Sequence, residues 1–250
     1  CVVTGTRAEY GLLYPILKEI ESREELLLKL VVSSAHLSEE FGLTYKKIEE
    51  DGFFINEKIE NLLSSDSKSA IAKSSGLATI LISDVFLRIK PDVLLILGDR
   101  FETHAVTTAA MLMNIPIAHI HGGEITEESV DEQIRHSITK MSTLHFCSNE
   151  VYRQRIIQMG EDPSMVFNTG APGIDNIVNL TLLSKDTLEK KLNWKLPSTC
   201  ALFTYHPETL NNYNLKEDLN SIFNVLINSG IGVLFTYSNA DSGGRIINKK

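Results

Sequence analysis

Two adjacent residues of opposite charge, Asp99 and Arg100, follow a run of large apolar residues and one glycine in "LLILGDRFE", residues 94–102. An apolar run without alternation is typical of a strand buried on both faces, as in a parallel sheet covered by helices. Gly98 then predicts the end of that strand. Because open α/β sheets bind ligands at the carboxyl ends of their strands, Asp99 and Arg100 are candidate functional residues.

A second candidate is Arg7, in "VVTGTRAEYG" at residues 2–11, a pattern that predicts a strand, a glycine turn and a helix start. A cation at a helix N-terminus is disfavoured by about 0.3–1 kcal/mol. A bound anion would remove this penalty, since backbone N–H groups and Arg7 would both face it. The segment has too few glycines for a dinucleotide-binding fingerprint and lacks the P-loop lysine. Arg7 is therefore either an anion ligand or a solvated arginine.

The segment "IPIAHIHGGE", residues 115–124, places His119, His121, two glycines and Glu124 at the end of the next predicted strand. The glycines permit close approach of the backbone to a ligand. A single histidine here is more often a hydrogen-bonded core residue, but this combination favours a ligand site. No second pair of ligands with metal-binding spacing follows, so we predict no metal.

Three further candidates follow predicted strands. His36, in "VVSSAHLS", is either a ligand at the same sheet edge or an ordinary loop histidine. His206 ends the apolar run in "ALFTYHPET", and Asn239 follows another in "LFTYSNADSGG". If the two halves of the chain face each other, these strand ends meet at a ligand between domains.

The segment "SVDEQIRHSITKM", residues 129–141, predicts a helix with Asp131 and Arg135 one turn apart. One interpretation is a surface salt bridge, which contributes a few tenths of a kcal/mol. The other is that Asp131, at the helix N-terminus after the glycine turn, points at the ligand site.

Apolar runs alternate with amphipathic stretches along most of the chain, which predicts an α/β fold with parallel sheets. The predicted strands are 1–4, 26–33, 92–97, 115–120, 144–148, 165–169, 200–205 and 231–237. The predicted helices are 12–20, 38–50, 80–87, 102–113, 129–141, 149–159 and 215–228. Glycine and proline in "NTGAPGIDN", 168–176, predict a domain boundary near 173, with a second unit from about 174.

The net charge, the lengths of the apolar runs and the cysteine content exclude several classes of partner and of cellular location. A net charge of −8 disfavours nucleic acid and anionic membranes as partners, because both reward a basic surface. No apolar run reaches the roughly 20 residues of a membrane span, and no signal peptide is visible. Three distant cysteines without metal-ligand spacing indicate free thiols in a reducing compartment. We therefore expect a cytoplasmic protein.

Seven motifs carry a resemblance to a known family; in chain order they are "GTRAEYG", "GDRFE", "HIHGGE", "DEQIRHSITKMS", "FNTGAPG", "HPETL" and "SNADSGG". Together they resemble the hydrolysing UDP-N-acetylglucosamine 2-epimerases, in the branch that serves sialic and related nonulosonic acid synthesis. The resemblance covers essentially all 250 residues. It implies two Rossmann-like domains facing across a cleft, a GT-B-like arrangement. The N-terminal domain would be 1–173, and 174–250 would begin an incomplete C-terminal nucleotide-binding domain.

The resemblance also implies a reaction without NAD, metal or other cofactor. UDP is eliminated across C1 and C2 of a UDP-sugar, and water then adds to the glycal with inversion at C2, which releases UDP and an N-acetylmannosamine-type sugar. We expect UDP-N-acetylglucosamine as substrate and a homodimer. The alternatives are UDP-N,N′-diacetylbacillosamine, leading to legionaminic acid, a non-catalytic UDP-sugar binding module, and a glycosyltransferase of the same architecture.

The site residues divide into two sets. The predicted UDP-sugar contacts are Arg7, His36, Arg100, His206 and Asn239. The predicted catalytic residues are Asp99, His121, Glu124, Asp131 and His206. Other branches of the family carry a glutamate at the position of His121, so either His121 or Glu124 takes that role.

Overall fold

In the computed structural model, which describes residues 1–206, 215–238 and 244–249, the chain divides into two compact units. The first comprises Cys1–Ser65 and Ser69–Val178, and the second Asp66–Lys68 and Asn179–Lys250. The division falls a few residues beyond position 173. Helix α7 (Pro172–Asn179) contacts α1 (Arg7–Ser22) of the first unit, because the Asn176 side-chain amide donates to the Gly11 carbonyl over 2.5 Å.

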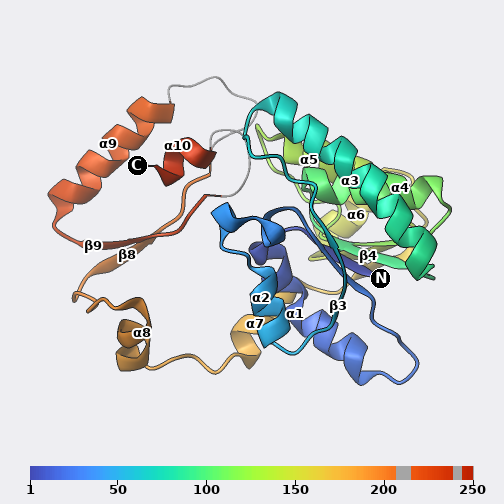
Figure 1. Ribbon diagram of the computed structural model, residues 1–250, viewed down its shortest axis with the longest axis horizontal. Helices are drawn as coiled ribbons and strands as arrows, with labels where there is room; N and C mark the ends of the chain where they lie inside the picture. Colours follow the sequence, from blue (N-terminus) through green and yellow to red (C-terminus); the bar gives the residue numbers. More distant parts are fainter. Residues whose placement is uncertain (207–214, 239–243, 250) are drawn as a thin grey trace. The chain divides into compact units, whose positions relative to one another are not determined.

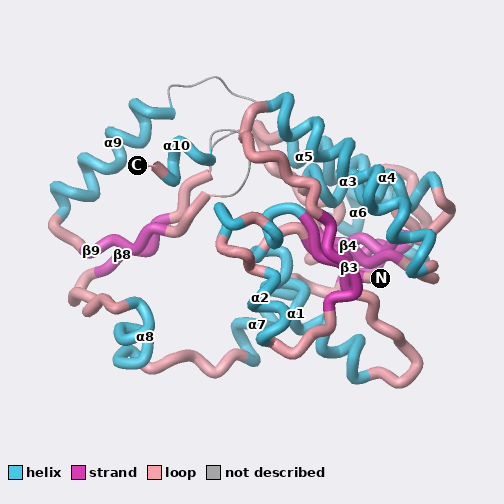
Figure 2. Tube along the Cα trace, viewed as in Figure 1, coloured by secondary structure: helices cyan, strands magenta, loops and turns pink. Residues whose placement is uncertain are grey.

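Apolar runs form the sheet of the first unit, as predicted. Among the described residues this sheet has seven strands in the order β3-β2-β1-β4-β5-β6-β7, all paired in parallel (Figures 1 and 2). The strands are β1 Val2–Thr4, β2 Leu30–Ser33, β3 Ile55–Ile59, β4 Leu94–Leu97, β5 Ile117–Ile120, β6 Leu144–Cys147 and β7 Val166–Asn168. The chain order reverses between β1 and β4, which makes this pair the point where such sheets bind ligands.

Helices cover both faces of this sheet and bury two large apolar clusters, besides a small third one of Cys147, Ile156 and Val166. Besides α1 and α7, the first unit contains α2 Tyr45–Glu50, α3 Lys68–Ile89, α4 Phe101–Leu112, α5 Val130–Met141 and α6 Glu150–Gln158. One cluster includes Phe86 of α3, Val106 of α4 and Ile138 of α5, and the other includes Leu13 of α1 and Ile48 of α2. Each fully buried side chain of this size contributes about 1.5–3 kcal/mol.

The structure corrects three of the predicted elements. Strand β3 was not predicted, because it lies at the sheet edge and three consecutive polar residues stand between Ile55 and Ile59. The helix predicted at 38–50 is shorter: 3₁₀ turns precede Gly42, whose φ of +83° interrupts the helix, and α2 follows. Helix α3 begins well before position 80, the predicted start.

Helix α3 is long and apolar enough to cross a membrane by composition, with a mean hydropathy of 1.5 over an 18-residue window. One side of it packs into the first unit through Ala78, Ile82 and Phe86. This packing is typical of a core helix. The three cysteines are free, as predicted.

The second unit repeats the α/β pattern. Strands β8 (Cys200–Phe203) and β9 (Gly232–Phe235) pair in parallel, and α9 (Leu215–Ser229) connects them through residues that are partly outside the described ranges. The rings of Phe223 and Phe235 pack edge to face at 5.4 Å. Helices α8 (Lys185–Leu192) and α10 (Gly244–Asn248) complete this unit among the described residues. The predicted α/β class with parallel sheets therefore holds for both units.

Candidate active site

Arg7 and Arg100 follow the two strands at which the chain order reverses. Arg7 is the first residue of α1 and is exposed, and Arg100 is the N-cap of α4. Strands β1 and β4 are neighbours, so their carboxyl ends lie at one edge of the sheet. Two helix N-termini, each with an arginine, therefore lie at the edge where an anionic ligand is expected, and the Arg7 guanidinium itself packs 5.7 Å from the centre of the Tyr10 ring.

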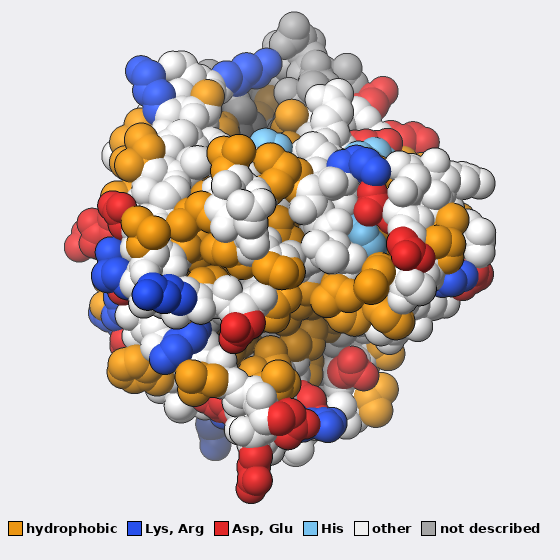
Figure 3. Space-filling view, turned by 90° about the vertical axis from the view of Figure 1, so that its right-hand side faces the viewer, with side chains coloured by type: hydrophobic (Ala, Val, Ile, Leu, Met, Phe, Trp, Pro, Cys, Tyr) orange, Lys and Arg blue, Asp and Glu red, His pale blue; other side chains and the backbone are white. Residues whose placement is uncertain are grey.

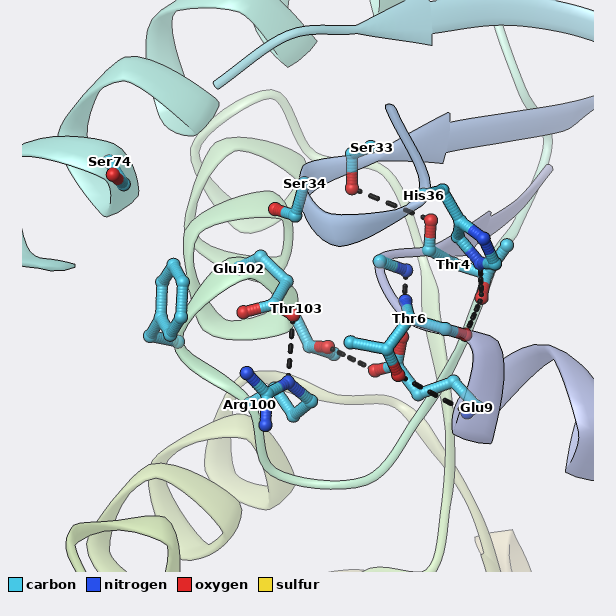
Figure 4. Close-up of polar contacts among 12 residues, drawn as sticks. Thr4, Thr6, Glu9, Ser33, Ser34, His36, Ser74, Arg100, Glu102 and Thr103 are labelled. Carbon is cyan, nitrogen blue, oxygen red and sulfur yellow. Dashed lines mark hydrogen bonds and ion pairs between the residues drawn. The ribbon is translucent and has the colours of Figure 1, made fainter. Parts of the chain in front are cut away.

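A buried carboxylate orients Arg100. Glu102 Oε1 accepts a hydrogen bond from Arg100 Nε over 2.8 Å, and the Glu102 side chain is only 2% exposed (Figure 4). Its Oε2 is buried and has no hydrogen-bond partner within the part of the chain that the structure describes. A Cβ on Gly5 would approach Glu102 Cγ to 2.6 Å, so glycine is required where β1 ends.

A second buried carboxylate, Glu9, belongs to the same cluster. With Thr6 it forms a capping box at the start of α1, since Glu9 Oε2 accepts from the Gly5 and Thr6 N–H groups over 2.7 and 3.0 Å. Thr103 Oγ1 donates to its other oxygen over 3.1 Å. Burial raises the pKa of Glu9 to about 7, and the neighbouring Glu102 adds to the rise. Glu9 therefore titrates near neutral pH.

Asp99 pairs with an arginine that the sequence did not assign to it. Arg135 Nη2 of α5 donates both to the Asp99 carboxylate and, over 2.9 Å, to Thr126 Oγ1. These contacts replace the predicted pair of Asp131 and Arg135, so that interpretation is wrong. Arg135 Nε and Nη1 are buried and have no hydrogen-bond partner among the described residues. The carboxylate at the end of β4 thus faces a buried cation.

Asp131 lies in the first turn of α5, as predicted. Its carboxylate accepts from Ser129 Oγ over 2.5 Å, and Ser129 Oγ caps the helix by accepting from the Asp131 N–H. A carboxylate here is stabilised by the helix dipole. The remaining interpretation of Asp131, a carboxylate for the ligand site, stays a prediction.

His121 and Glu124 contact each other at the end of β5. His121 Nδ1 lies 2.6 Å from Glu124 Oε1, and Ser148 Oγ donates to the same oxygen over 2.8 Å. We had expected the neighbouring glycines to make room for a ligand, but in the structure they do not. A Cβ on Gly123 would lie 2.7 Å from the Tyr152 carbonyl, and a Cβ on Gly122 would contact protein atoms as well. The glycines allow α5 and α6 to approach the strand end.

Two of the candidate histidines, His36 and His119, are fully buried in the first unit. His36 is fully buried, with Nε2 3.2 Å from Thr4 Oγ1 and Nδ1 2.8 Å from Thr44 Oγ1. Burial, with a contribution from Arg7, lowers its pKa to about 4. His119 Nε2 donates to the Gly98 carbonyl over 2.7 Å, and burial lowers its pKa to about 4. Both are neutral near pH 7. The His36 side chain links the end of β1 to Thr44 through its two ring nitrogens. Its contact with substrate stays a prediction.

His206 is the predicted site residue described in the second unit. It is exposed after β8, and its Nδ1 lies 3.3 Å from Ser238 Oγ, which follows β9. Ser238 is itself held by Asn248, whose side chain accepts from its N–H over 2.7 Å. Asn239 lies outside the described residues. The second unit therefore also presents polar groups beyond two parallel strands.

Sequence reasoning missed four members of the first-unit site: Glu9, Glu102, Arg135 as the partner of Asp99, and Ser148. Thr103 and Glu9 meet across 94 positions, and Arg135 and Asp99 across 36, so no local pattern signals either contact. Thr6 and Glu9 do have capping-box spacing, which was the available signal. Among the described residues, no group of three or more His, Cys, Asp or Glu side chains could hold a metal ion.

Comparison with known proteins gives consistent similarities. A family model described as UDP-N-acetylglucosamine 2-epimerase matches residues 18–250. The chain is 44% identical over 250 residues to the "GDP/UDP-N,N'-diacetylbacillosamine 2-epimerase (hydrolyzing)" of Campylobacter jejuni, covering 100% of this chain and 65% of that protein. It is 38% identical over 250 residues to "Polysialic acid biosynthesis protein P7" of Escherichia coli, covering 99% and 64%. The chain thus spans just under two thirds of these curated relatives.

Among solved structures, the fold resembles that of a Methanocaldococcus jannaschii UDP-GlcNAc 2-epimerase in complex with UDP-GlcNAc and UDP. The TM-score is 0.78 at 19% identity, and the match covers 99% of this chain and 67% of that one. At this identity the similarity concerns the fold. It confirms the predicted GT-B-like fold class.

Proposed function

Because the chain belongs to the UDP-N-acetylglucosamine 2-epimerase family, we propose that the complete protein is a hydrolysing 2-epimerase of a UDP-linked 2-acetamido sugar. The observation that carries this proposal is the convergence of Arg7, Asp99, Arg100 and His121 on one edge of the first sheet. Parallel register sets Leu97 beside Ile120, so the chain leaves β4 and β5 at the same level. Cations for a diphosphate and proton-transfer groups for a sugar thereby come from neighbouring strand ends.

In the proposed reaction, Arg7 and Arg100 bind the diphosphate and stabilise the charge that develops as UDP departs. Arg100 suits this role because Glu102 holds its Nε, which fixes the plane of the guanidinium. The C2 proton is weakly acidic and requires a positioned base. Asp99, Asp131 and His121 supply the proton-transfer groups, and a proton returns to C2 on the opposite face as water adds to C1.

Two UDP-sugars are candidate substrates. The 44% identity to a relative named for diacetylbacillosamine supports UDP-N,N′-diacetylbacillosamine. The family model described as UDP-N-acetylglucosamine 2-epimerase, and a 32% identical Neisseria meningitidis relative of that name, support UDP-N-acetylglucosamine, the substrate predicted from the sequence. The two sugars differ at C4 and C6. Turnover of both by one preparation therefore measures the preference directly.

We also propose a homodimer that uses the outer surfaces of α3 and α4. Four large apolar side chains are exposed there: Ile80 and Leu87 of α3, and Met111 and Leu112 of α4. Figure 3 views this side of the first unit and shows hydrophobic atoms gathered on it. Exposed apolar patches of this kind favour association. Sedimentation equilibrium of the complete protein tests this, and the double variant Ile80→Glu, Leu87→Glu should be monomeric.

The reaction is tested by incubating the complete protein with each UDP-sugar in deuterium oxide. We expect one UDP per turnover and a free sugar with deuterium at C2, because the lost proton is replaced from solvent. Mass spectrometry and enzymatic UDP assay measure both, with Asp99→Asn as the matched inactive control. Free sugar without deuterium would refute the elimination mechanism, and product still attached to UDP would indicate a non-hydrolysing epimerase. Binding without turnover of either sugar would support the non-catalytic module.

A further inference from the structure

His121, Glu124 and Ser148 form a hydrogen-bonded chain at the ends of β5 and β6. Glu124 Oε1 receives both contacts, from His121 Nδ1 at 2.6 Å and from Ser148 Oγ at 2.8 Å. The His121 and Glu124 side chains are 17% and 25% exposed, so one side of the pair reaches the surface. The two strands pair in parallel and end together, and Asp99 leaves β4 at the same level. The pair therefore belongs to the sheet edge described above.

Glu124 determines which nitrogen of the His121 ring carries a proton. Although burial acts to raise the pKa of Glu124, the hydrogen bonds from His121 and Ser148 outweigh it and hold that pKa below its usual range. An ionised carboxylate can only accept hydrogen bonds, so Nδ1 must carry the hydrogen. In the neutral ring Nε2 is then the basic nitrogen. No hydrogen bond within the described part of the chain engages Nε2.

The backbone also fixes the ring. His121 has a φ of +66°, a left-handed conformation that costs a non-glycine residue about 1–2 kcal/mol. Its N–H nevertheless donates to the Phe146 carbonyl over 3.0 Å, and the next two residues are glycines packed against protein atoms. Strained residues persist where the surroundings over-determine them, and they cluster at functional sites. The side chain is thus delivered to one position before any ligand binds.

Resting on the proposed function, we propose that His121 removes the C2 proton of the sugar through Nε2, and that Glu124 is the positioning residue that holds the ring in this tautomer. As Nε2 takes the proton, the C2–H bonding pair forms the C1=C2 bond. The C1–O bond to UDP breaks, and its electron pair leaves with the diphosphate. The resulting imidazolium lies against the Glu124 carboxylate, which stabilises its charge.

Two other basic groups, His119 and Arg155, lie near this pair and keep their charge state in a neutral assay. His119 interacts electrostatically with His121, but burial lowers the pKa of His119 to about 4, so it stays neutral in a neutral assay. From α6, Arg155 donates to the Gly123 carbonyl and keeps a constant charge. The charges of His119 and Arg155 are therefore the same in wild type and in a Glu124 variant at neutral pH.

The test compares Glu124→Gln with Glu127→Gln in the complete protein. Glu127 lies on the same loop and is exposed, so its variant should match the wild type. Glu124→Gln should lower kcat about 100-fold, with KM changed less than about 3-fold, because proton transfer is impaired and binding is not. Nitrogen-15 NMR of the imidazole should change from a single Nδ1–H tautomer to a mixture.

A double-mutant cycle provides the second criterion. If Glu124 acts through His121, Glu124→Gln should cause no further loss of kcat in a His121→Gln background. An equal loss in both backgrounds, or a wild-type tautomer of the His121 ring in Glu124→Gln, would overturn the proposal. Failure of the wild type to turn over either UDP-sugar would instead refute the proposed function, and this role with it. Unchanged circular dichroism and UDP affinity of each variant verify that it is folded.

Discussion

Glu9 gives the most quantitative prediction, because its carboxyl is buried where α1 begins and its pKa is raised from 4.5 to about 7. The folded state therefore holds this proton more tightly than the unfolded state does. The resulting stability is fully present below pH 4.5 and is lost as the pH rises through about 7. At 1.36 kcal/mol per pKa unit, the total loss is about 3 kcal/mol.

Glu9→Gln should remove this dependence. The amide oxygen can accept from the Gly5 and Thr6 N–H groups as Oε2 does, and the amide nitrogen can donate to the Thr103 hydroxyl. The variant thus mimics protonated glutamate at every pH. Its free energy of unfolding relative to wild type should rise by about 2–3 kcal/mol between pH 5 and pH 8.

The assay is native-state amide exchange of β2 in urea at a series of pH values, which confines the measurement to the first unit. Glu25→Gln is the control, because Glu25 is exposed in the loop after α1 and its replacement should leave the pH dependence unchanged. Carboxyl carbon-13 NMR of Glu9 should show a midpoint near 7. A constant difference between wild type and Glu9→Gln at every pH would refute the burial argument.

Three further outcomes are expected. Arg7→Ala should weaken UDP binding by about 1.5–3 kcal/mol in calorimetry, the loss of a charge-assisted hydrogen bond, and unchanged affinity would remove Arg7 from the site. Asp99→Asn should reduce kcat about 100-fold with UDP affinity largely kept, whereas near-normal turnover would make Asp99 structural. Gly123→Ala should destabilise the first unit by about 2–4 kcal/mol in urea unfolding, since the φ is +77° and the Cβ would meet the Tyr152 carbonyl; a stable variant would contradict that packing.

The sequence predicted the elements that are buried on both faces. Strand β4 is an unbroken apolar run, β5 is apolar except for His119, and glycine or polar residues follow both strands, so their positions and their functional ends could be predicted. Strand β3 was not predicted because this edge strand carries three polar residues in a row and resembles a polar loop in sequence. The periodicity of a segment does not indicate which other strand pairs with it in the sheet.

The sequence identified the residues of the candidate site better than it identified the contacts between them. Asp99, Arg100, His121 and Glu124 were recognised from their places after strands. The pairing of Asp99 with Arg135 depends on how α5 packs beside β4, and spacing along α5 favoured a different partner. We had expected either His121 or Glu124 to take the role of the glutamate found in other branches of the family. In the structure the two side chains contact each other.

The pairing of β1 with β4 has a consequence for how the protein folds. It joins segments far apart in the chain, since the Cys1 amino group meets the Val93 carbonyl across 92 positions. Doubling a loop costs only about 0.6 kcal/mol, so the separation affects the rate more than the final stability. The strands before and after this seam can each pair with nearer neighbours in the chain, so we expect the seam to close last. Because Arg7 and Arg100 flank it, UDP should slow the reopening of this seam and protect its amides from exchange before those of β6.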